Sequence, residues 1–464
     1  MTVEKLFNIL NISEENVNNF EISNITSDTR KIEENTIFFL FDKKYVDKVI
    51  NTNVRIVLTN LNVSLDNKKV IIIEDLLECY SKCLKIFYLN YNPYIIGITG
   101  TCGKTTTSTL IYRTIKDSNK SVLLLCSNGV YSYFNKQESF FETFNTTPNL
   151  ETIYYHMSTH NFDYVIIEVS SQGIANNRIY GIDFDLCVFL NFSQDHLDYH
   201  ITLENYLETK LKLFNQIKKD GIGVFNCNFL YKDKVSNNLI NNYTFGINNG
   251  VFKISVIKVD LKQMKLKIED KCISTNFTGL HNAENIAASY AVIKLLDIKL
   301  QHLYRVLQQY YAIEGRYEII NYLSNNIIID FAHTEKEFDV ILSHLNRNKL
   351  NKLYVIAGCG GNRDKHKRPI LGKLCSKYAD FTVLTEDNSR DENLDNIIID
   401  IESGFVNNNY IVILDRFDAI KYGIELLNES DTLVILGMGK EKNYFLNDRY
   451  YSDKMIVEKI IEEV

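Results

Sequence analysis

The amino-acid sequence predicts an α/β protein with three domains, on the basis of its length, its pattern of apolar runs and one glycine-rich loop. The chain has 464 residues, of which 45% are hydrophobic and 23% charged, so it is globular and too long for a single core. Short apolar runs alternate with helical stretches, which is typical of sheets that helices cover on both faces. Changes in this pattern predict domains at 1–92, 93–316 and 317–464.

The first predicted domain is a mixed α/β domain. Short strands are expected at 36–41, 54–58 and 69–73, separated by polar loops, and an amphipathic helix is expected at 75–89. Pro93 then marks a change in the pattern, which places a boundary close to it.

The other two predicted domains share one sequence pattern, a series of continuous apolar runs. Continuous apolar runs at 121–126, 164–169, 186–192 and 223–227 predict a central, doubly wound and mainly parallel sheet. Runs at 353–358, 381–385, 410–414 and 432–436 predict a second, smaller, Rossmann-like α/β sheet. Ligands of open α/β sheets bind beyond the carboxyl ends of the strands, so the polar residues that follow these runs are the candidates for a site.

A phosphate-binding loop is expected at 97–107, where Gly-Ile-Thr-Gly-Thr-Cys-Gly-Lys-Thr-Thr-Thr follows an apolar strand and opens a helix. Glycines let backbone N–H groups approach phosphate oxygens, Lys104 adds a point charge, and the hydroxyl of Thr105 suits Mg²⁺. An ordinary glycine-rich turn is the alternative. The loop predicts ATP binding with Mg²⁺, and its candidate residues are Gly100, Thr101, Gly103, Lys104, Thr105 and Thr106.

A carboxylate and an imidazole follow two of the central runs. Glu168 ends the run that starts at Tyr164, and His196 lies shortly after the run that starts at Leu186. Beside a phosphate loop, such groups suit a divalent cation that also binds substrate oxygens. Taken alone, Glu168 fits a helix-capping or ion-pairing group equally well, and His196 fits a structural histidine.

Composition excludes several classes of protein. A net charge of −7 and a pI of about 5.8 argue against a general nucleic-acid surface and leave room for a local pocket for an anionic small molecule. No apolar run reaches the length of a membrane span, and the first residues lack a signal-peptide pattern, so a cytoplasmic protein without membrane insertion is expected. The nine cysteines include no Cys-x-x-Cys pair, and Cys79 and Cys83 fit buried thiols better than a zinc site. A monomer is expected.

A series of motifs in chain order resembles that of the Mur ligase family. The motifs lie at 26–30, 100–107, 145–148, 168–171, 178, 195–200, 206–214, 282–285, 315–318, 330–334 and 358–369, and they span all three predicted domains. The loop variant that starts at Gly100, with Ile98 where the standard spacing needs glycine, is also similar to this family. The resemblance is strongest to the ligases that add the third residue of the peptidoglycan stem peptide to UDP-N-acetylmuramoyl-L-alanyl-D-glutamate.

The resemblance implies a reaction and a set of catalytic residues. The family transfers the γ-phosphoryl group of ATP to a peptide carboxylate, and an amine attacks the acyl phosphate to give an amide, ADP and phosphate. The resemblance implies that Lys104 holds phosphates, that Thr105 and Glu168 hold one Mg²⁺, and that His196 holds a second. Lys210 matches a lysine that the family carries as a carbamate, an anionic oxygen ligand; an unmodified surface lysine is the alternative.

The resemblance also implies which residues hold the nucleotides and the acceptor. Asn282 would contact adenine, and Arg316 and Asp330 would reach the phosphates and ribose when the last domain closes over the nucleotide. Thr29 matches a serine that contacts uridine. The residues that would hold the sugar, its phosphates and the peptide are Thr146, Thr147, Ser170 and Arg178.

The amino acid that is added is implied by one further motif. Members that add meso-diaminopimelate carry Asp-Asn-Pro-Arg, whose guanidinium can hold the distal carboxylate, and this chain has Asp387-Asn388-Ser389-Arg390. Arg363, Gly437 and Glu441 stand at matching positions. Lysine would leave Arg390 facing an unpaired ammonium. Three departures from the family pattern are Ser389 for proline, Gly-Met-Gly-Lys-Glu at 437–441 for Gly-Lys-Gly-His-Glu, and Gln172 for histidine.

Three alternatives stay open from the sequence. A family member in a specialised pathway could use a different amino acid or acceptor, because kinship of fold does not fix the substrate. A folylpolyglutamate-type ligase shares the loop and the acyl-phosphate chemistry, but it is not expected to carry the N-terminal uridine-nucleotide domain. An ATP-binding subunit that works with a glutamine amidotransferase is expected to carry a four-cysteine zinc insert, which this chain lacks.

Overall fold

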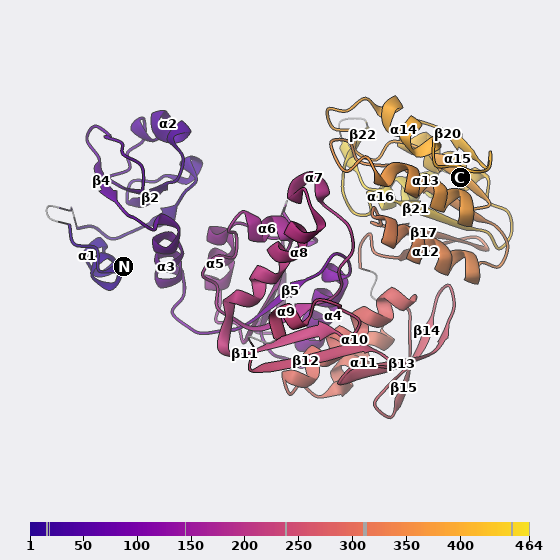
Figure 1. Cartoon of the computed structure of the whole chain (residues 1–464), viewed down its shortest axis with the longest axis horizontal. Coiled ribbons are helices and arrows are strands. Elements are labelled where there is room, and N and C mark those ends of the chain that lie inside the picture. Colours follow the sequence, from indigo (N-terminus) through magenta and orange to yellow (C-terminus); the bar gives the residue numbers. More distant parts are fainter. Residues whose placement is uncertain are drawn as a thin grey trace. The chain divides into compact units, whose positions relative to one another are not determined.

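The protein is a mixed α/β protein with parallel sheets, as the sequence predicts. The computed structural model describes residues 1–14, 17, 19–143, 145–236, 239–309, 313–446 and 449–463. The chain forms two compact units, which interleave along the sequence (Figure 1 gives the course of the chain). Unit 1 consists of Met1–Gly97, Asn119–Cys187 and Leu211–Ile222, and unit 2 of Ile98–Ser118, Val188–Lys210 and Gly223–Val464. The predicted boundaries at 92/93 and 316/317 stay predictions.

Unit 1 begins with a four-stranded parallel sheet. Its strands, in spatial and chain order, are β1 (Asn24–Thr26), β2 (Thr36–Leu40), β3 (Ile56–Thr59) and β4 (Lys69–Ile72). Its helices are α1 (Val3–Leu10), α2 (Val46–Ile50) and α3 (Leu76–Tyr88), with short 3₁₀ turns η1 (Thr29–Lys31) and η2 (Lys43–Tyr45). Phe38 and Val57 of the sheet pack with Val49 of α2 in one apolar cluster. The predicted strands and helix are confirmed, and Cys79 and Cys83 are free, buried thiols on α3.

The other strands of unit 1 range from the fully buried β6 to the fully exposed β8. β6 (Val122–Cys126) pairs in parallel with β9 (Tyr164–Glu168) and antiparallel with β7 (Gly129–Phe134), which pairs with β8 (Gln137–Phe141). Helices α5 (Leu150–Ser158) and α6 (Ser171–Ala175) start at the side-chain caps Asn149 and Ser170, and η3 spans Lys212–Gln216. All residues of β6 are buried, which explains why the sequence shows it as an unbroken apolar run.

Three strands contribute residues to both units, namely β5 (Tyr94–Thr99), β10 (Phe184–Phe189) and β11 (Ile217–Asn226). Unit 2 adds helices α4 (Lys104–Asp117), α7 (Leu197–His200), α8 (Leu203–Leu211), α9 (Asp233–Ser236), α10 (Leu280–Leu295) and α11 (Leu300–Gln308). It also adds β12 (Asn241–Ile247), β13 (Phe252–Val259), β14 (Met264–Ile268) and β15 (Lys271–Thr275), of which β13, β14 and β15 pair antiparallel. The sequence reading missed these strands, although the alternation of Met-Lys-Leu-Lys-Ile in β14 matches its alternating burial.

The last part of unit 2 is a six-stranded sheet with the order β16-β17-β21-β18-β19-β20. The strands are β16 (Glu318–Tyr322), β17 (Asn325–Asp330), β18 (Leu353–Ala357), β19 (Phe381–Leu384), β20 (Tyr410–Val412) and β21 (Thr432–Leu436). Only β16 is antiparallel to its neighbour. The carboxyl ends of the parallel strands therefore meet at one edge, where a site is expected.

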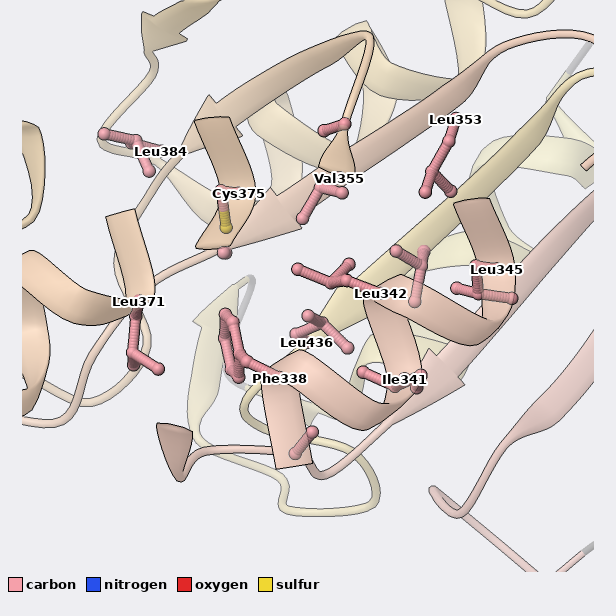
Figure 2. Close-up of a cluster of buried hydrophobic side chains, with 14 of the residues drawn as sticks. Phe338, Ile341, Leu342, Leu345, Leu353, Val355, Leu371, Cys375, Leu384 and Leu436 are labelled. Carbon is pink, nitrogen blue, oxygen red and sulfur yellow. The ribbon is translucent and has the colours of Figure 1, made fainter. Parts of the chain in front are cut away.

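Helices cover both faces of this sheet. One apolar cluster joins the sheet to α12 (Glu335–Asn348), α13 (Lys367–Tyr378) and α14 (Leu394–Glu402), and Figure 2 shows Phe338 and Leu342 of α12 beside Leu436 of β21. A second cluster joins it to α15 (Arg416–Glu425) and α16 (Asp453–Glu462). A short hairpin follows β21, formed by β22 (Tyr444–Leu446) and β23 (Arg449–Tyr451). Among the described residues, no helix is long and apolar enough to cross a membrane.

We expect Leu342→Ala to destabilise the protein, because Leu342 is completely buried in the first cluster and its truncation leaves a cavity. The expected loss is about 2–5 kcal/mol of unfolding free energy. Urea unfolding followed by circular dichroism measures it. Leu350→Ala is the control, since Leu350 is 80% exposed, and its effect should stay within about 0.5 kcal/mol. Equal effects of the two changes would contradict the assigned core.

Candidate active site

The phosphate loop joins β5 to α4, because β5 ends at Thr99 and α4 begins at Lys104. Gly103 precedes the helix with a φ of 82°, a left-handed backbone that residues with a side chain rarely adopt. A Cβ at this position would lie 2.1 Å from the side-chain oxygen of Asn285 on α10. Glycine is therefore required both by the backbone and by the close approach of α10. The N-terminus of α4 favours a negatively charged ligand.

Asn191, which follows β10, holds the phosphate loop in place. Its side-chain oxygen accepts the N–H of Cys102 at 2.9 Å, and its side-chain nitrogen donates to the carbonyl of Cys102 at 3.1 Å. Its own carbonyl accepts the N–H of Thr101 at 3.1 Å. Sequence reasoning did not assign a role to Asn191. Its place just after a buried strand is the one signal that could have found it.

Two lysines meet at the carbonyl of Gly100. Lys104 Nζ donates to Gly100 O at 3.0 Å and to Thr101 O at 2.9 Å, and Lys210 Nζ donates to Gly100 O at 2.8 Å. Lys210 lies on α8, is buried, and has its nitrogen 4.6 Å from the centre of the Tyr206 ring. Burial, with the charge of Lys104, lowers the pKa of Lys210 far below its usual range. Burial therefore disfavours the charged form of Lys210.

A cluster of two histidines surrounds Asp195. His196 Nε2 lies 3.3 Å, and His333 Nε2 3.8 Å, from the same carboxylate oxygen of Asp195. Burial lowers the pKa of His196 to about 4, so its imidazole is neutral. Burial alone would raise the pKa of Asp195, but the neighbouring His333 holds it below its usual value. Sequence reasoning had assigned a role to His196 but not to Asp195 or His333.

A cavity of about 420 Å³ adjoins the phosphate loop, within unit 2. Gly103 and Thr106 of the loop line it together with three of the predicted nucleotide-binding residues, Asn282, Arg316 and Asp330. Asn282 is fixed by its side-chain bonds, because its nitrogen donates to Thr278 O at 2.9 Å and its oxygen accepts from Asn285 Nδ2 at 3.2 Å. The structure thus brings these predicted residues together at one cavity.

Asp330 stands at the end of β17 and binds two backbone groups. Its carboxylate accepts the N–H of Tyr317 and the N–H of Ala332, both at 2.7 Å. Burial raises the pKa of Asp330 to about 6, although Arg316 opposes this shift. The Arg316 guanidinium lies 4.5 Å from the centre of the Phe331 ring, which orients it along the cavity wall.

A second group of predicted residues lies in unit 1. Glu168 at the end of β9 is buried, and its two oxygens lie 2.8 Å from the backbone nitrogen and 3.0 Å from the hydroxyl of Ser127. The Ser127 hydroxyl is also 3.0 Å from that of Thr146. Ser127 therefore connects the two predicted residues, and sequence reasoning had missed it.

Thr147, Ser170 and Arg178 complete this group. The Thr147 hydroxyl donates to Glu168 O at 2.8 Å and accepts the N–H of Ser170 at 2.9 Å. Arg178 Nη1 donates to Thr147 O at 3.0 Å. Five residues from three separate stretches of the sequence, which sequence reasoning assigned to the metal or the acceptor, thus form one hydrogen-bonded network with Ser127 at the ends of β6 and β9.

Thr29 belongs to the same unit, in the turn η1, and its motif is tied to α5. Glu151 of α5 is buried and accepts a hydrogen bond at 2.7 Å from the Thr26 hydroxyl and another at 2.7 Å from Lys31 Nζ. Asp28 caps η1 by accepting the N–H of Arg30. The motif that contains Thr29 is thereby fixed close to the segment that follows Thr147.

The third group lies at the carboxyl ends of β18 and β19, in unit 2. The loops after these strands interlock: Gly361 N–H donates to Asn388 O at 2.7 Å, and Arg390 Nη1 donates to Gly361 O. A Cβ at Gly361 would lie 1.9 Å from Ser389 O. Ser389, where the family has proline, donates its hydroxyl to Glu386 Oε1 at 2.8 Å, which fixes the turn by a hydrogen bond instead of a ring.

Asp387 faces Gly437 across the ends of β19 and β21. A Cβ at Gly437, whose φ is 111°, would lie 2.8 Å from Asp387 Oδ2. Burial raises the pKa of Asp387, a shift that Arg416 opposes and Glu441 increases. In a neighbouring loop, Arg363 Nη1 donates to Asp198 Oδ2 at 3.1 Å. The predicted residues of this group are therefore neighbours around one strand edge.

Comparisons with known proteins decide the family. The Mur ligase middle domain matches residues 98–293, and the Mur ligase glutamate ligase domain matches residues 315–439. The UDP-N-acetylmuramoyl-L-alanyl-D-glutamate–2,6-diaminopimelate ligase 1 of Clostridium acetobutylicum is 31% identical, with 96% of this chain and 96% of that protein covered. The chain belongs to the Mur ligase family.

Solved structures share the fold of this Mur ligase. A UDP-N-acetylmuramoyl-L-alanyl-D-glutamate–2,6-diaminopimelate ligase matches with a TM-score of 0.69 at 25% identity, over 100% of this chain and 99% of the other. The MurF ligase of Thermotoga maritima in complex with ADP matches with a TM-score of 0.68 at 16% identity, over 95% and 97% of the two chains, which shows the fold alone. As a Mur ligase, the protein is an ADP-forming, ATP-dependent ligase of small-molecule substrates.

The predicted metal ligands of this Mur ligase are divided between the units. Thr105, His196 and Lys210 belong to unit 2 and Glu168 to unit 1, so their convergence on Mg²⁺ stays a prediction. The donor set fits the ion, because hydroxyl and carboxylate oxygens are the ligands that Mg²⁺ prefers. Within the described ranges, no group of three or more His, Cys, Asp and Glu side chains is arranged to hold a metal.

Two histidines of the cavity were missed by sequence reasoning. His281 Nδ1 and His344 Nε2 are buried and have no hydrogen-bond partner among the described residues, and both side chains line the cavity beside Tyr317. Burial lowers the pKa of each to about 4. Isolated histidines on helices carry no local signal, so only the folded chain brings them together.

We expect His281 and His344 to stay neutral from about pH 7.5 down to about pH 5.5, because their pKa values are depressed to about 4. For a depressed histidine, the contribution to stability is present above about pH 6.5 and is lost as the pH falls through about 4. Nitrogen-15 NMR of the imidazoles, assigned with His281→Gln and His344→Gln, measures this. A titration of either ring near pH 6.5 would contradict the burial.

Proposed function

We propose that this Mur ligase adds meso-diaminopimelate to UDP-N-acetylmuramoyl-L-alanyl-D-glutamate in peptidoglycan synthesis, through an acyl phosphate. The observation that carries the proposal is the interlocking of the Arg390 loop with the loop that holds Arg363, at the edge where Asp387 faces Gly437. The names of the similar ligases support the same reaction. The proposal assigns each group of residues described above to one substrate.

ATP is proposed to bind in the cavity beside the phosphate loop. Lys104 and the amides at the start of α4 hold its phosphates, in a position where negative charge is favoured. Asn282 contacts adenine, while Arg316 and Asp330 reach the phosphates and the ribose. Gly100, Thr101, Gly103 and Thr106 keep the loop close to the nucleotide. Most of the catalysis then consists of positioning and of neutralising negative charge.

Mg²⁺ is proposed to be held by Thr105 and Glu168, and a second ion by His196 with Lys210 as its carbamate. When bound, the ions neutralise charge on the transferred phosphoryl group. The depressed pKa of Lys210 supports the modification, because only the uncharged amine adds carbon dioxide. The neutral imidazole of His196 is likewise the form that binds a metal.

The acceptor is proposed to bind in unit 1. Thr29 contacts the uridine, and the network of Thr146, Thr147, Ser170 and Arg178 holds the sugar, its phosphates and the peptide. The support is the hydrogen bonding that joins the last four residues to one another and to Glu168. These side chains would give hydroxyl and guanidinium donors to phosphate oxygens.

The added amino acid is proposed to bind at the β18–β19 edge. Arg390 and Arg363 hold its distal carboxylate, and Asp387 with Glu441 faces its amine, while Asn388 and Gly437 shape the pocket. Lysine, which lacks the distal carboxylate, would place an ammonium against Arg390. A different amino acid is the second candidate, which the departures at Ser389 and at 438–440 favour.

We also propose that the enzyme works in the cytoplasm as a monomer. The use of ATP supports the cytoplasmic setting, and one chain supplies all the side chains named above. Sedimentation velocity of the purified protein measures its mass in solution, and a dimer would contradict the second part.

We expect turnover when ATP, Mg²⁺ and the muramoyl dipeptide are offered with meso-diaminopimelate, and we expect Lys104→Ala to abolish it, with a loss of about 10³-fold or more. The assay offers meso-diaminopimelate, lysine and ornithine in parallel, and measures product mass and phosphate. Lys82→Ala is the control, because Lys82 is exposed on α3. If no amine gives a coupled product together with ADP, the proposed reaction is wrong.

Arg390→Ala should raise the KM for meso-diaminopimelate by at least about tenfold, because it removes a charged partner of the distal carboxylate. The KM for ATP should change little. Steady-state kinetics with each substrate varied in turn measures both constants. Arg305→Ala serves as a matched control, since Arg305 pairs with Asp117 on the surface. A change of both KM values by the same factor refutes the assignment of Arg390.

A further inference from the structure

We propose that Arg416, the first residue of α15, is a positioning residue for the amino-acid subsite, where it holds the loop after β19 and the end of β21 so that Asp387 and Gly437 keep their spacing. This inference rests on the proposed function of that edge. Arg416 stands outside the motifs that the sequence analysis singled out. The contacts of its guanidinium carry the inference.

The Arg416 side chain is buried and paired with an equally buried carboxylate. Its exposed fraction is 1%, and that of Asp453 is 0%. Nε donates to Asp453 Oδ1 at 2.7 Å, and Nη2 donates to Asp453 Oδ2 at 2.9 Å. This two-point contact fixes the plane of the guanidinium, and so it fixes the direction of the remaining N–H groups.

The remaining donors of Arg416 bind the loop that follows β19 and the last residue of β21. Nη1 donates to the carbonyl of Glu386 at 2.8 Å, and Nη2 donates to the carbonyl of Leu436 at 3.0 Å. The next residues along the chain are Asp387 and Gly437, which approach closely: a Cβ added at Gly437 would lie 2.8 Å from Asp387 Oδ2. The Arg416 side chain therefore sets the distance between Asp387 and Gly437.

Glu386 passes this constraint to the turn that carries Arg390. Its backbone N–H donates to Leu414 O at 3.2 Å, and its carboxylate accepts the Ser389 hydroxyl at 2.8 Å. A shift of Glu386 would thus move both Asp387 and Ser389. Through its contact with Glu386, Arg416 therefore influences the residues proposed to bind the amine and the distal carboxylate.

A contribution to stability is by itself a weak explanation for the buried ion pair of Arg416 and Asp453. Apolar side chains of similar size often replace a buried ion pair with no loss of stability, whereas removal of one partner leaves an uncompensated charge. Lysine also cannot replace arginine here, because its ammonium is a point charge without the planar fork that reaches two carbonyls and one carboxylate. Arg416→Lys therefore keeps the positive charge but removes the planar arrangement of N–H donors.

The test compares Arg416→Lys and Asp453→Asn with Asp431→Asn. Asp431 is a matched control: it is also completely buried, but it lies at the opposite end of β21, where it accepts the N–H groups of Lys352 and Asn428. We expect Arg416→Lys to raise the KM for the amino acid by about tenfold or more, with the KM for ATP within about twofold. Asp431→Asn should leave the amino-acid KM unchanged, even where it lowers the melting temperature.

Hydrogen exchange supplies a readout that does not depend on activity. Amide hydrogen exchange at 386–390 and 437–439 should become faster in Arg416→Lys. If Arg416→Lys does not fold, Asp453→Asn should show the same faster exchange. Asp431→Asn should leave the exchange rates of both segments unchanged. An unaltered amino-acid KM with unaltered exchange would overturn the inference, as would equal effects in Asp431→Asn. A wild-type enzyme that couples no amino acid would overturn the proposed function instead, and the exchange data would still decide the role of Arg416.

Discussion

Where a buried strand ends, the neighbouring backbone N–H and C=O groups are shielded from water and need hydrogen-bond partners. In this protein, residues of the site supply those partners and thereby hold its loops in place. Asn191 binds three backbone groups of the phosphate loop at the end of β10. Asp330 binds two N–H groups at the end of β17, and Arg416 binds two carbonyls, one in the loop after β19 and one at the end of β21. Each polar side chain satisfies a buried backbone group and, in doing so, fixes a functional loop.

Burial also sets the charges with which the site meets its substrates. The pKa values of Lys210 and His196 are lowered because burial disfavours their charged forms, and the pKa of Asp330 is raised for the same reason. A neutral amine and a neutral imidazole are suited to modification and to metal binding, which positively charged forms would prevent. The low polarity that shifts these pKa values comes from the same packing that holds the loops.

Much of the architecture could be predicted because its signals are local. The unbroken apolar runs of β6, β9 and β21 and the loop before α4 each lie within a few consecutive residues. The antiparallel strands β13–β15 were missed because the strands of this domain were predicted from continuous apolar runs, whereas the side chains of β14 alternate between buried and exposed. His344 was missed as a member of the site because nothing near it in sequence marks its role. Asn191 and Ser127 were missed because their one local signal is a place just after a buried strand.

The sequence by itself determined the α/β class, the phosphate loop and the order of the family motifs, because backbone preference and burial patterns act over a few residues. Only the tertiary structure decided that Gly103 must admit Asn285, that Lys210 shares a carbonyl with Lys104, and that Arg416 joins the loop after β19 to the end of β21. These contacts depend on the order of strands in the sheets, which brings together residues that are distant along the chain and which no short pattern encodes.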